Sequence, residues 1–166
     1  MITVRLYQKD DASYVGKLIA ETYSAYNLSF APLEQRGAFL GPFQYADSLK
    51  KSHQEAIANA IEASIVLVAE KEGEIVGVLR GRMDKLQSLF VSGSHHRQGI
   101  GRKLVEQFEQ DCARQGAKEI RVMSTLYAVS FYQAMGYKKT TGVRRMKSFA
   151  GEGFKYQPMK KVLKNG

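Results

Sequence analysis

One stretch decides the fold, and it reads Leu89-Phe90-Val91-Ser92-Gly93-Ser94-His95-His96-Arg97-Gln98-Gly99-Ile100-Gly101-Arg102. Its start is an apolar strand pattern, and from Gly101 to Gln115 apolar residues recur at helical spacing. Glycine at 99 and at 101 removes side chains where backbone N–H groups converge at the start of a helix. Those donors and the helix dipole predict a binding site for a diphosphate.

The positive side chains beside the turn favour a diphosphate site, and the glycine pattern indicates which kinds of nucleotide-binding site it is not. Arg97, Arg102 and Lys103 add positive charge beside the turn. A nicotinamide-type fingerprint would need a third glycine where Leu104 stands, and no Gly-Lys-Ser/Thr sequence of a P-loop is present. The pattern therefore argues against both of these nucleotide-binding folds.

The segments around this turn predict a mixed α/β fold with one mostly antiparallel sheet flanked by helices. A tight turn at 71–74 predicts a β-hairpin, and a second turn is expected near 83–85. We expect Tyr14 on the inward face of the first helix and Leu49 on that of the second. The predicted strands are 3–7, 65–70, 75–79, 86–91, 119–123, about 144–146 and 156–162, and the predicted helices are 10–26, 45–63, 101–115 and 128–135.

Length and composition predict one domain over residues 1–166. No apolar run is long enough to span a membrane, and the N-terminus lacks the layout of a signal peptide, so we expect a cytoplasmic protein. The lone cysteine, Cys112, is interpreted as a small core residue. Residues 138–166 hold nine Lys/Arg and one acidic residue, for a charge of +8 out of the total of +9. That bias suits an anionic ligand or partner, or serves solubility alone.

The strand and turn resemble the acetyl-CoA signature of the GNAT-type N-acetyltransferases. The residues that carry the likeness run from His96 to Gly101. About thirty residues later, the stretch from Ala128 to Tyr137 is similar to the helix and turn that bear a tyrosine in that family. The two likenesses together cover residues 86–137. Two departures are His96, where the family usually has Gln or Arg, and Met123, where an Asn often touches pantetheine and Ser124 is the nearest polar substitute.

The resemblance implies direct transfer of an acetyl group from acetyl-CoA to a primary amine of a small molecule or peptide, with no metal. It implies that the strand splays from its neighbour, so that the Phe90 amide polarises the thioester carbonyl and Tyr132 protonates the leaving thiolate. Phe90 and Tyr132 are thus the expected catalytic residues. The expected cofactor-binding residues are Leu89, Phe90, Val91, Arg97, Gln98, Gly99, Ile100, Gly101, Arg102, Lys103, Ser124 and Tyr132.

The general base and the acceptor stay open at this point. Candidates for the base are Asp84, His95, His53, Glu62 and a chain of water molecules. In the family the loop after the first helix often lines the acceptor pocket, and ordinary core packing is the alternative for its aromatic residues, which are Tyr23, Tyr26, Phe30, Phe39, Phe43 and Tyr45.

Two other functions compete with the enzyme. The basic C-terminal third with Phe149, Phe154 and Tyr156 suggests a nucleic-acid-binding module, and a non-catalytic sensor of coenzyme A would need the same turn. We favour the enzyme over nucleic-acid binding, because no RNA-recognition or helix-turn-helix motif accompanies the charge, and we expect no membrane partner, because no long apolar run is present. A homodimer through a sheet edge around residues 138–162 is an analogy with relatives.

Overall fold

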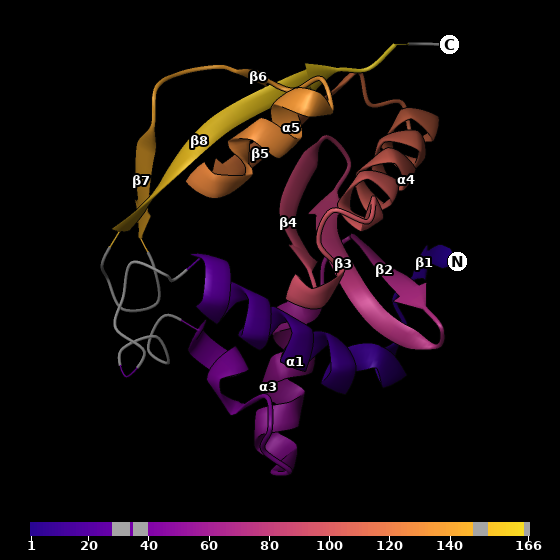
Figure 1. The fold of residues 1–166 in the computed structure, drawn as a ribbon, viewed down its shortest axis with the longest axis vertical. Coiled ribbons are helices and arrows are strands. Elements are labelled where there is room, and N and C mark those ends of the chain that lie inside the picture. The colour runs from indigo at the N-terminus through magenta and orange to yellow at the C-terminus, as the bar shows by residue number, and fades with distance from the viewer. Residues whose placement is uncertain (28–33, 35–39, 148–152, 165–166) are drawn as a thin grey trace.

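A computed structural model describes residues 1–27, 34, 40–147 and 153–164. It contains an eight-stranded sheet in the order β1-β2-β3-β4-β5-β8-β6, with β7 also paired to β8. The mixed α/β class with helices on both faces of the sheet is confirmed (Figure 1). The strands are β1 (Ile2–Leu6), β2 (Ile65–Lys71), β3 (Glu74–Arg82), β4 (Lys85–Val91), β5 (Glu119–Thr125), β6 (Lys138–Lys139), β7 (Arg144–Lys147) and β8 (Gly153–Val162), and the helices are α1 (Ala12–Thr22), α3 (Lys51–Ile61), α4 (Ile100–Arg114) and α5 (Val129–Ala134).

Two tight turns build the antiparallel half of the sheet. Glu72 and Gly73 both have positive φ between β2 and β3, which is the geometry of a two-residue hairpin. Met83 and Asp84 form another two-residue connection, between β3 and β4, in which only Asp84 has positive φ, at 70°. Both predicted turns are therefore confirmed.

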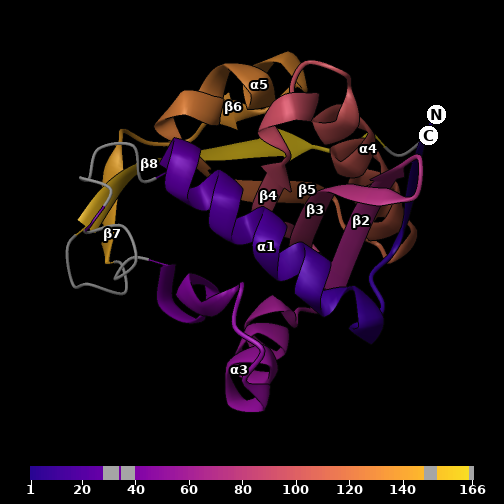
Figure 2. The same ribbon diagram turned by 60° about the horizontal axis from the view of Figure 1, so that its bottom comes forward.

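Helices cover the sheet in two layers, as Figures 1 and 2 show. One apolar cluster under α4 and α5 contains Leu79, Leu104 and Phe108. The second cluster, under α1 and α3, contains Val15, Ile61 and Val78. Along β5, buried and exposed residues alternate, and the exposed side includes Met123 at 39%. The β5 end of the sheet is thus covered on the α4 and α5 face and open on the other.

β4 and β5 form a parallel pair that diverges almost at once. Their register covers only Lys85 with Arg121 and Leu86 with Val122, and beyond that point the strands do not pair. β5 then continues along β8 as far as Thr125 opposite Tyr156, whereas β4 turns away toward α1 (Figure 1). The splay that the family resemblance implied is therefore present.

A buried polar cluster fastens β8 and the end of α5 to α4. The Tyr137 hydroxyl donates to one Glu109 oxygen at 2.9 Å, and Lys161 Nζ donates to the other at 2.8 Å. Both contacts satisfy a carboxylate that is mostly removed from water. This cluster fixes the direction in which β8 runs past the splay.

The prediction that Leu49 and Tyr14 are core residues is wrong. Leu49 is 90% exposed, because the chain makes a separate 3-10 helix at Gly41–Tyr45 and α3 begins only at Lys51. Tyr14 is 66% exposed, although its helix is placed correctly. The buried face of α1 is centred closer to Gly16, where an added Cβ would lie 2.7 Å from Ile57 Cγ2 of α3.

Candidate functional site

A bulge in β4 sets the direction of every group near the splay. The register shifts between Arg80 and Gly81 of β3, which leaves Gln87 of β4 without a partner. An extra residue reverses the alternation of a strand from that point on. As a result Leu86 and Leu89, three residues apart, both pack against the cluster under α4 and α5.

The reversed alternation decides where the Phe90 amide points. The Ser92 N–H donates to the Val76 carbonyl at 2.9 Å. Hydrogen-bonded and non-hydrogen-bonded pairs alternate along an antiparallel ladder, and Phe90 faces Val78 two residues earlier. The Phe90 amide is therefore directed to β3. This strand pairing does not favour the expected contact between the Phe90 amide and the thioester.

Phe90 contributes a side chain to the second cluster instead. It is 8% exposed, and the Tyr23 ring lies against it with centroids 5.9 Å apart. By the same alternation, the N–H groups of Leu89 and Val91 are turned away from β3, toward the side vacated by β5. These two amides are the main-chain donors available at the splay.

The turn at the start of α4 uses its two glycines for different reasons. Gly99 is the N-cap of α4 and has φ 80°, a left-handed conformation that favours glycine, although a Cβ there would meet open space. Gly101 has an ordinary helical place, but an added Cβ would lie 3.2 Å from Phe131 Cζ of α5. Gly99 thus shapes the turn, and Gly101 lets α5 pack onto α4.

The cations near this turn are held in different ways. Arg97 is exposed, has φ 64°, and makes no ion pair within the described ranges. Arg102 pairs with Glu106 at 3.6 Å. Lys103 Nζ contacts the Ile2 carbonyl at 3.4 Å, so it reaches toward β1.

Two further side chains shape the turn. Gln98 accepts a hydrogen bond from Lys71 Nζ at 2.7 Å, which ties the β2–β3 hairpin to the turn. Sequence reasoning missed Lys71, because only the tertiary structure brings it near. His96 Nε2 donates to the Val91 carbonyl at 2.8 Å and so closes the loop between β4 and the turn.

Tyr132 lies on α5 in the cluster that faces α4. Its side chain is 4% exposed, and its ring packs edge-on against Phe131 and Tyr137 at 5.1 and 5.5 Å between centroids. Burial, and secondarily the nearby Tyr127, raises the pKa of the Tyr132 hydroxyl. The phenol is therefore protonated at neutral pH, as a proton donor must be.

Ser124, the expected contact for pantetheine, is engaged locally. It is 1% exposed, and its hydroxyl donates to the Thr125 carbonyl at 2.7 Å. Ile100, another expected contact, is 1% exposed and packs in the core cluster under α4. Its side chain stabilises the helix start, which leaves its backbone as the group that faces the turn.

The candidate bases lie at different places. Asp84 stands in the β3–β4 turn, five residues and about 17 Å along the strand from Leu89. His53 stacks on Tyr45 at 4.0 Å between centroids near the start of α3. His95 interacts with Ser94 at 3.1 Å in the loop before the turn.

Glu62 follows α3 and is connected to the splayed strand through Arg80. It ends α3, and Arg80 donates to its carbonyl at 3.2 Å and to Ser88 Oγ at 3.4 Å. Ser88 immediately precedes Leu89 on β4. Through Arg80, the main chain at Glu62 is thus linked to the strand that carries Leu89.

The aromatic cluster is divided between core and surface. Tyr23 and Phe43 pack against the second cluster, while Tyr45 is 43% exposed. Tyr26 belongs to the π-helix Tyr23–Asn27 that continues α1. Phe30, Phe39 and Phe149 and the side chains of Tyr26 and Phe154 lie outside the described residues.

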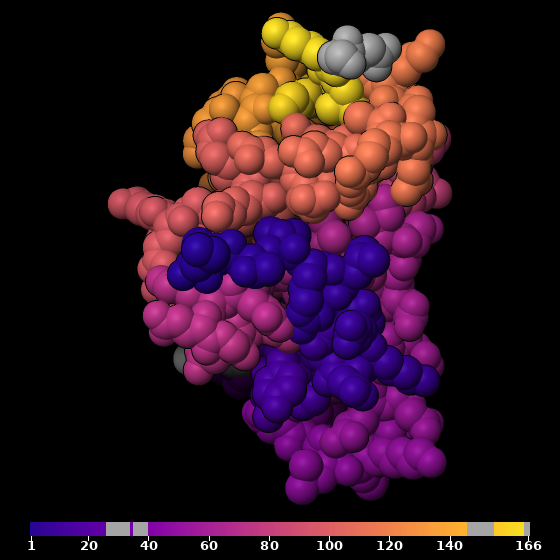
Figure 3. Space-filling model, turned by 90° about the vertical axis from the view of Figure 1, so that its right-hand side faces the viewer, coloured from indigo at the N-terminus to yellow at the C-terminus, as the bar shows by residue number. Residues whose placement is uncertain are grey.

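A hollow on another face is separate from the splay. It has a volume of about 590 Å³ and is lined by residues of β1, β2 and the second half of α4, including Arg5, Gln107 and Arg114. Figure 3 shows the face on which β1 and α4 meet. Because this hollow is at the β1 edge of the sheet, it does not serve the turn at Gly99.

Cys112 and possible metal ligands were also located. Cys112 is fully buried, and burial raises the pKa of its thiol, so the interpretation as a core residue is confirmed. Within the described part of the chain, no three His, Cys, Asp or Glu side chains are grouped to hold a metal ion. None of the helices in that part is both long and apolar enough to cross a membrane.

Comparison with known proteins gives this geometry a family. The family model described as Acetyltransferase (GNAT) domain matches residues 32–163. The chain belongs to the GNAT acetyltransferase family. The matched region of this GNAT chain contains the splayed strands, the Gly99 turn and Tyr132.

Curated relatives of this GNAT chain match over a shorter region. Human N-acetyltransferase 8 is 38% identical over 87 residues, and N-acetyltransferase family 8 member 3 of Rattus norvegicus is 34% identical over 86 residues. Each match covers 44% of this chain and 38% of the relative. The chain thus spans less than half the length of the relatives that it matches.

Solved structures share the fold along the whole GNAT chain. A GCN5-related N-acetyltransferase from Rhodopseudomonas palustris superposes with a TM-score of 0.79 at 20% identity, over 97% of this chain and 95% of that one. PaiA N-acetyltransferase from Thermoplasma acidophilum, in complex with coenzyme A, gives 0.73 at 17% identity, over 98% and 99%. A putative acetyltransferase from Salmonella typhimurium with acetyl-CoA gives 0.65 at 16% identity, over 100% and 96%. The likeness is therefore one of architecture.

Proposed function

We propose that this protein transfers the acetyl group of acetyl-CoA to a primary amine of a small molecule or peptide. The observation that carries the proposal is the splay of β4 from β5 beside a helix that starts at Gly99. The turn offers N–H groups to the pyrophosphate, and the splay offers the outward amides of Leu89 and Val91 to pantetheine. Family membership supplies the cosubstrate that fits both features.

The reaction needs stabilisation of an oxyanion and a proton for the leaving group. We assign the first to the Leu89 amide, because its N–H points to the splay and that of Phe90 does not. The amine nitrogen bonds to the carbonyl carbon, the C–S bond breaks, and the nitrogen loses a proton to a base or to water. Tyr132 donates a proton to the departing thiolate.

The faces of the sheet suggest how the acceptor approaches. α4 and its turn lie on one face, so a cofactor arm that passes between β4 and β5 presents its thioester toward the other face. That face carries α1 and α3 under β2 to β4 and is open at β5. Tyr23 beside Phe90 and Glu62 beyond Arg80 lie on this side.

Replacing one backbone amide by an ester tests the assignment of Leu89. The α-hydroxy acid analogue at position 89 removes the outward N–H and weakens the Ser88 carbonyl only as an acceptor, and kcat should fall about 10²-fold. The same change at position 90 removes a ladder donor and should lower stability while kcat stays within threefold. Release of free thiol from acetyl-CoA with a panel of amines gives both rates.

Two results would count against the proposal. A larger loss of kcat from the ester at 90 than from the ester at 89 would return the role to Phe90. Binding of coenzyme A without thiol release for any amine would indicate a non-catalytic sensor.

A further inference from the structure

Basic residues of the C-terminal third come together at the β5 end of the sheet. The segments 138–147 and 153–164 contain no Asp or Glu. Lys160 reaches Glu119 at 3.5 Å and Lys161 reaches Glu109 at 2.8 Å. Across the described ranges, the remaining basic side chains of known position make no ion pair, and these are Lys138, Lys139, Arg144, Arg145, Lys155 and Lys164.

Some of these cations face each other directly. Arg145 of β7 is the cross-strand partner of Lys155 of β8, and both are exposed. Lys138 of β6 is likewise opposite Lys160. Like charges at directly opposite positions destabilise a strand pair, so an anion bound here would relieve a cost that folding imposes.

The hairpin of β7 and β8 borders the transfer site. β5 ends at Thr125 opposite Tyr156, and β8 extends beyond that point to pair with β7. Figures 1 and 2 both show this hairpin near the C-terminal end of α1, on the other side of β4 from α4. The turn has cations of its own in Arg97 and Lys71, so the cofactor phosphates do not account for those of the hairpin.

We propose that the acceptor amine is carried on an acidic peptide whose carboxylates bind the β7–β8 hairpin at Arg145 and Lys155, which are cross-strand partners. This inference rests on the proposed acetyl transfer, because the hairpin lies next to the splay at which the thioester would be held. The hairpin would hold the carboxylates while the amine reaches the thioester at Leu89. A peptide amine, once neutral, attacks readily, whereas the exocyclic amines of nucleobases are poor nucleophiles because their lone pairs are delocalised. The chemistry therefore favours an acidic peptide over nucleic acid.

Binding of labelled peptides to the full chain loaded with coenzyme A tests the inference. Three peptides of equal length, each with one lysine, would carry acidic, neutral or basic flanks, and a single-stranded oligonucleotide would match the acidic peptide in charge. Fluorescence anisotropy should show the acidic peptide binding at least tenfold more tightly than the neutral one at low salt. Raising the salt concentration should reduce that preference.

Charge reversal locates the site. R145E combined with K155E should weaken binding of the acidic peptide about tenfold or more and leave the affinity for coenzyme A unchanged. R145Q with K155Q should have an intermediate effect. K17E combined with K118E makes the same change in net charge at exposed positions of α1 and before β5, and should change binding less than twofold.

The outcomes separate the two proposals. Equal binding of acidic and neutral peptides, equal loss in the Lys17 and Lys118 control, or tighter binding of the oligonucleotide would each overturn the acidic acceptor. Acetyl transfer is judged separately, by thiol release with the neutral peptide. If thiol is released but the acidic peptide binds no more tightly than the neutral one, acetyl transfer is supported and the proposal of an acidic peptide acceptor is wrong.

Discussion

At the scale of single residues, burial decides what Tyr132 can do. Its side chain is in an apolar cluster, and the rise of its pKa on burial favours the neutral phenol. A phenol that stays protonated at neutral pH is in the state that a proton donor needs. The packing of Phe131 and Tyr137 around it fixes the ring.

Removing the hydroxyl gives the first prediction at this scale. Tyr132→Phe should lower kcat about 10²-fold with little change in the KM for acetyl-CoA, because only the proton donor is lost. Thiol release measured between pH 6 and 9 checks it, and the wild type should show no loss of rate from ionisation of this tyrosine. Tyr14→Phe, on the exposed side of α1, is the control. An unchanged kcat for Tyr132→Phe would remove the residue from the mechanism.

At the scale of elements, the start of α4 depends on one left-handed residue. Gly99 allows the chain to enter the helix directly from the loop that His96 closes. Gly116 ends the same helix with φ 96°, and an added Cβ would also meet open space there. The two glycines therefore have the same backbone requirement at opposite ends of α4.

Substituting each glycine by alanine separates stability from binding. Gly99→Ala and Gly116→Ala should each lower the free energy of unfolding by about 1–2 kcal/mol, because alanine disfavours a left-handed conformation. Only Gly99→Ala should weaken the binding of coenzyme A, roughly tenfold, since it moves the N–H groups at the positive end of the helix. Urea unfolding and calorimetry measure the two effects. Equal affinities in both variants would show that the turn does not hold the cofactor.

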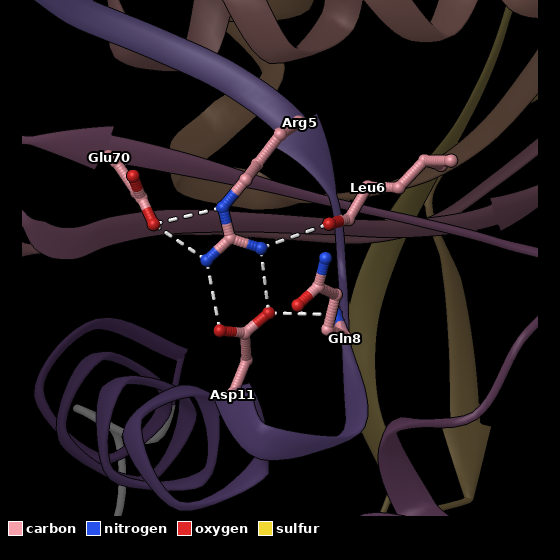
Figure 4. A network of polar contacts seen from close by, with 5 residues as sticks. All are labelled: Arg5, Leu6, Gln8, Asp11 and Glu70. Atoms are coloured by element: carbon pink, nitrogen blue, oxygen red, sulfur yellow. Dashed lines mark hydrogen bonds and ion pairs between the residues drawn. The ribbon is translucent and has the colours of Figure 1, made fainter.

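At the scale of the whole molecule, a salt-bridge network joins the N-terminal strand to the rest. Arg5 on β1 donates to Asp11 at 2.8 and 2.9 Å and to Glu70 on β2 at 2.6 Å (Figure 4). Asp11 also accepts a hydrogen bond from the Gln8 amide at 2.7 Å. The hydrogen bond from Arg5 is the main reason that the pKa of Asp11 is lowered.

This network predicts a dependence of stability on pH. The lowered pKa means that the Asp11 carboxylate stabilises the fold above its ordinary value of 3.8, and that this stabilisation is lost as the pH falls below it. Asp11→Asn should cost about 1–2 kcal/mol at pH 7 and progressively less toward pH 3. Urea unfolding at several pH values tests this, with the exposed Asp10→Asn as control. A cost that stays constant between pH 7 and pH 3 would contradict it.

The charge of the sheet edge around residues 138–162 affects whether two copies of the chain can pair through it. The edge around residues 138–162, expected from analogy to pair two copies, carries Arg144 and Arg145 in an exposed strand. Charged side chains on an edge strand disfavour pairing with an identical edge. Dimerisation through this edge remains a prediction, to be tested by the mass of the protein in solution.

The sequence by itself determined the elements and the turn, because hydrophobic period and glycine placement are local properties. The β2–β3 and β3–β4 hairpins, the helix α4 and the helix α5 that carries Tyr132 were all predicted from such patterns. Helix ends next to irregular segments were not predicted correctly. Leu49 was assigned to a helix, but α3 begins two residues later, at Lys51.

Only the tertiary structure decided which groups face the reaction. The bulge at Gln87 arises from pairing between strands, and it turns the Phe90 amide into the ladder and the Leu89 amide out of it. Pairing between strands also brings Lys71 into contact with Gln98 at the turn, and it brings the basic residues of β7 and β8 next to the splay. Contacts between residues far apart in the chain depend on how the strands pair, and local sequence patterns do not contain that information.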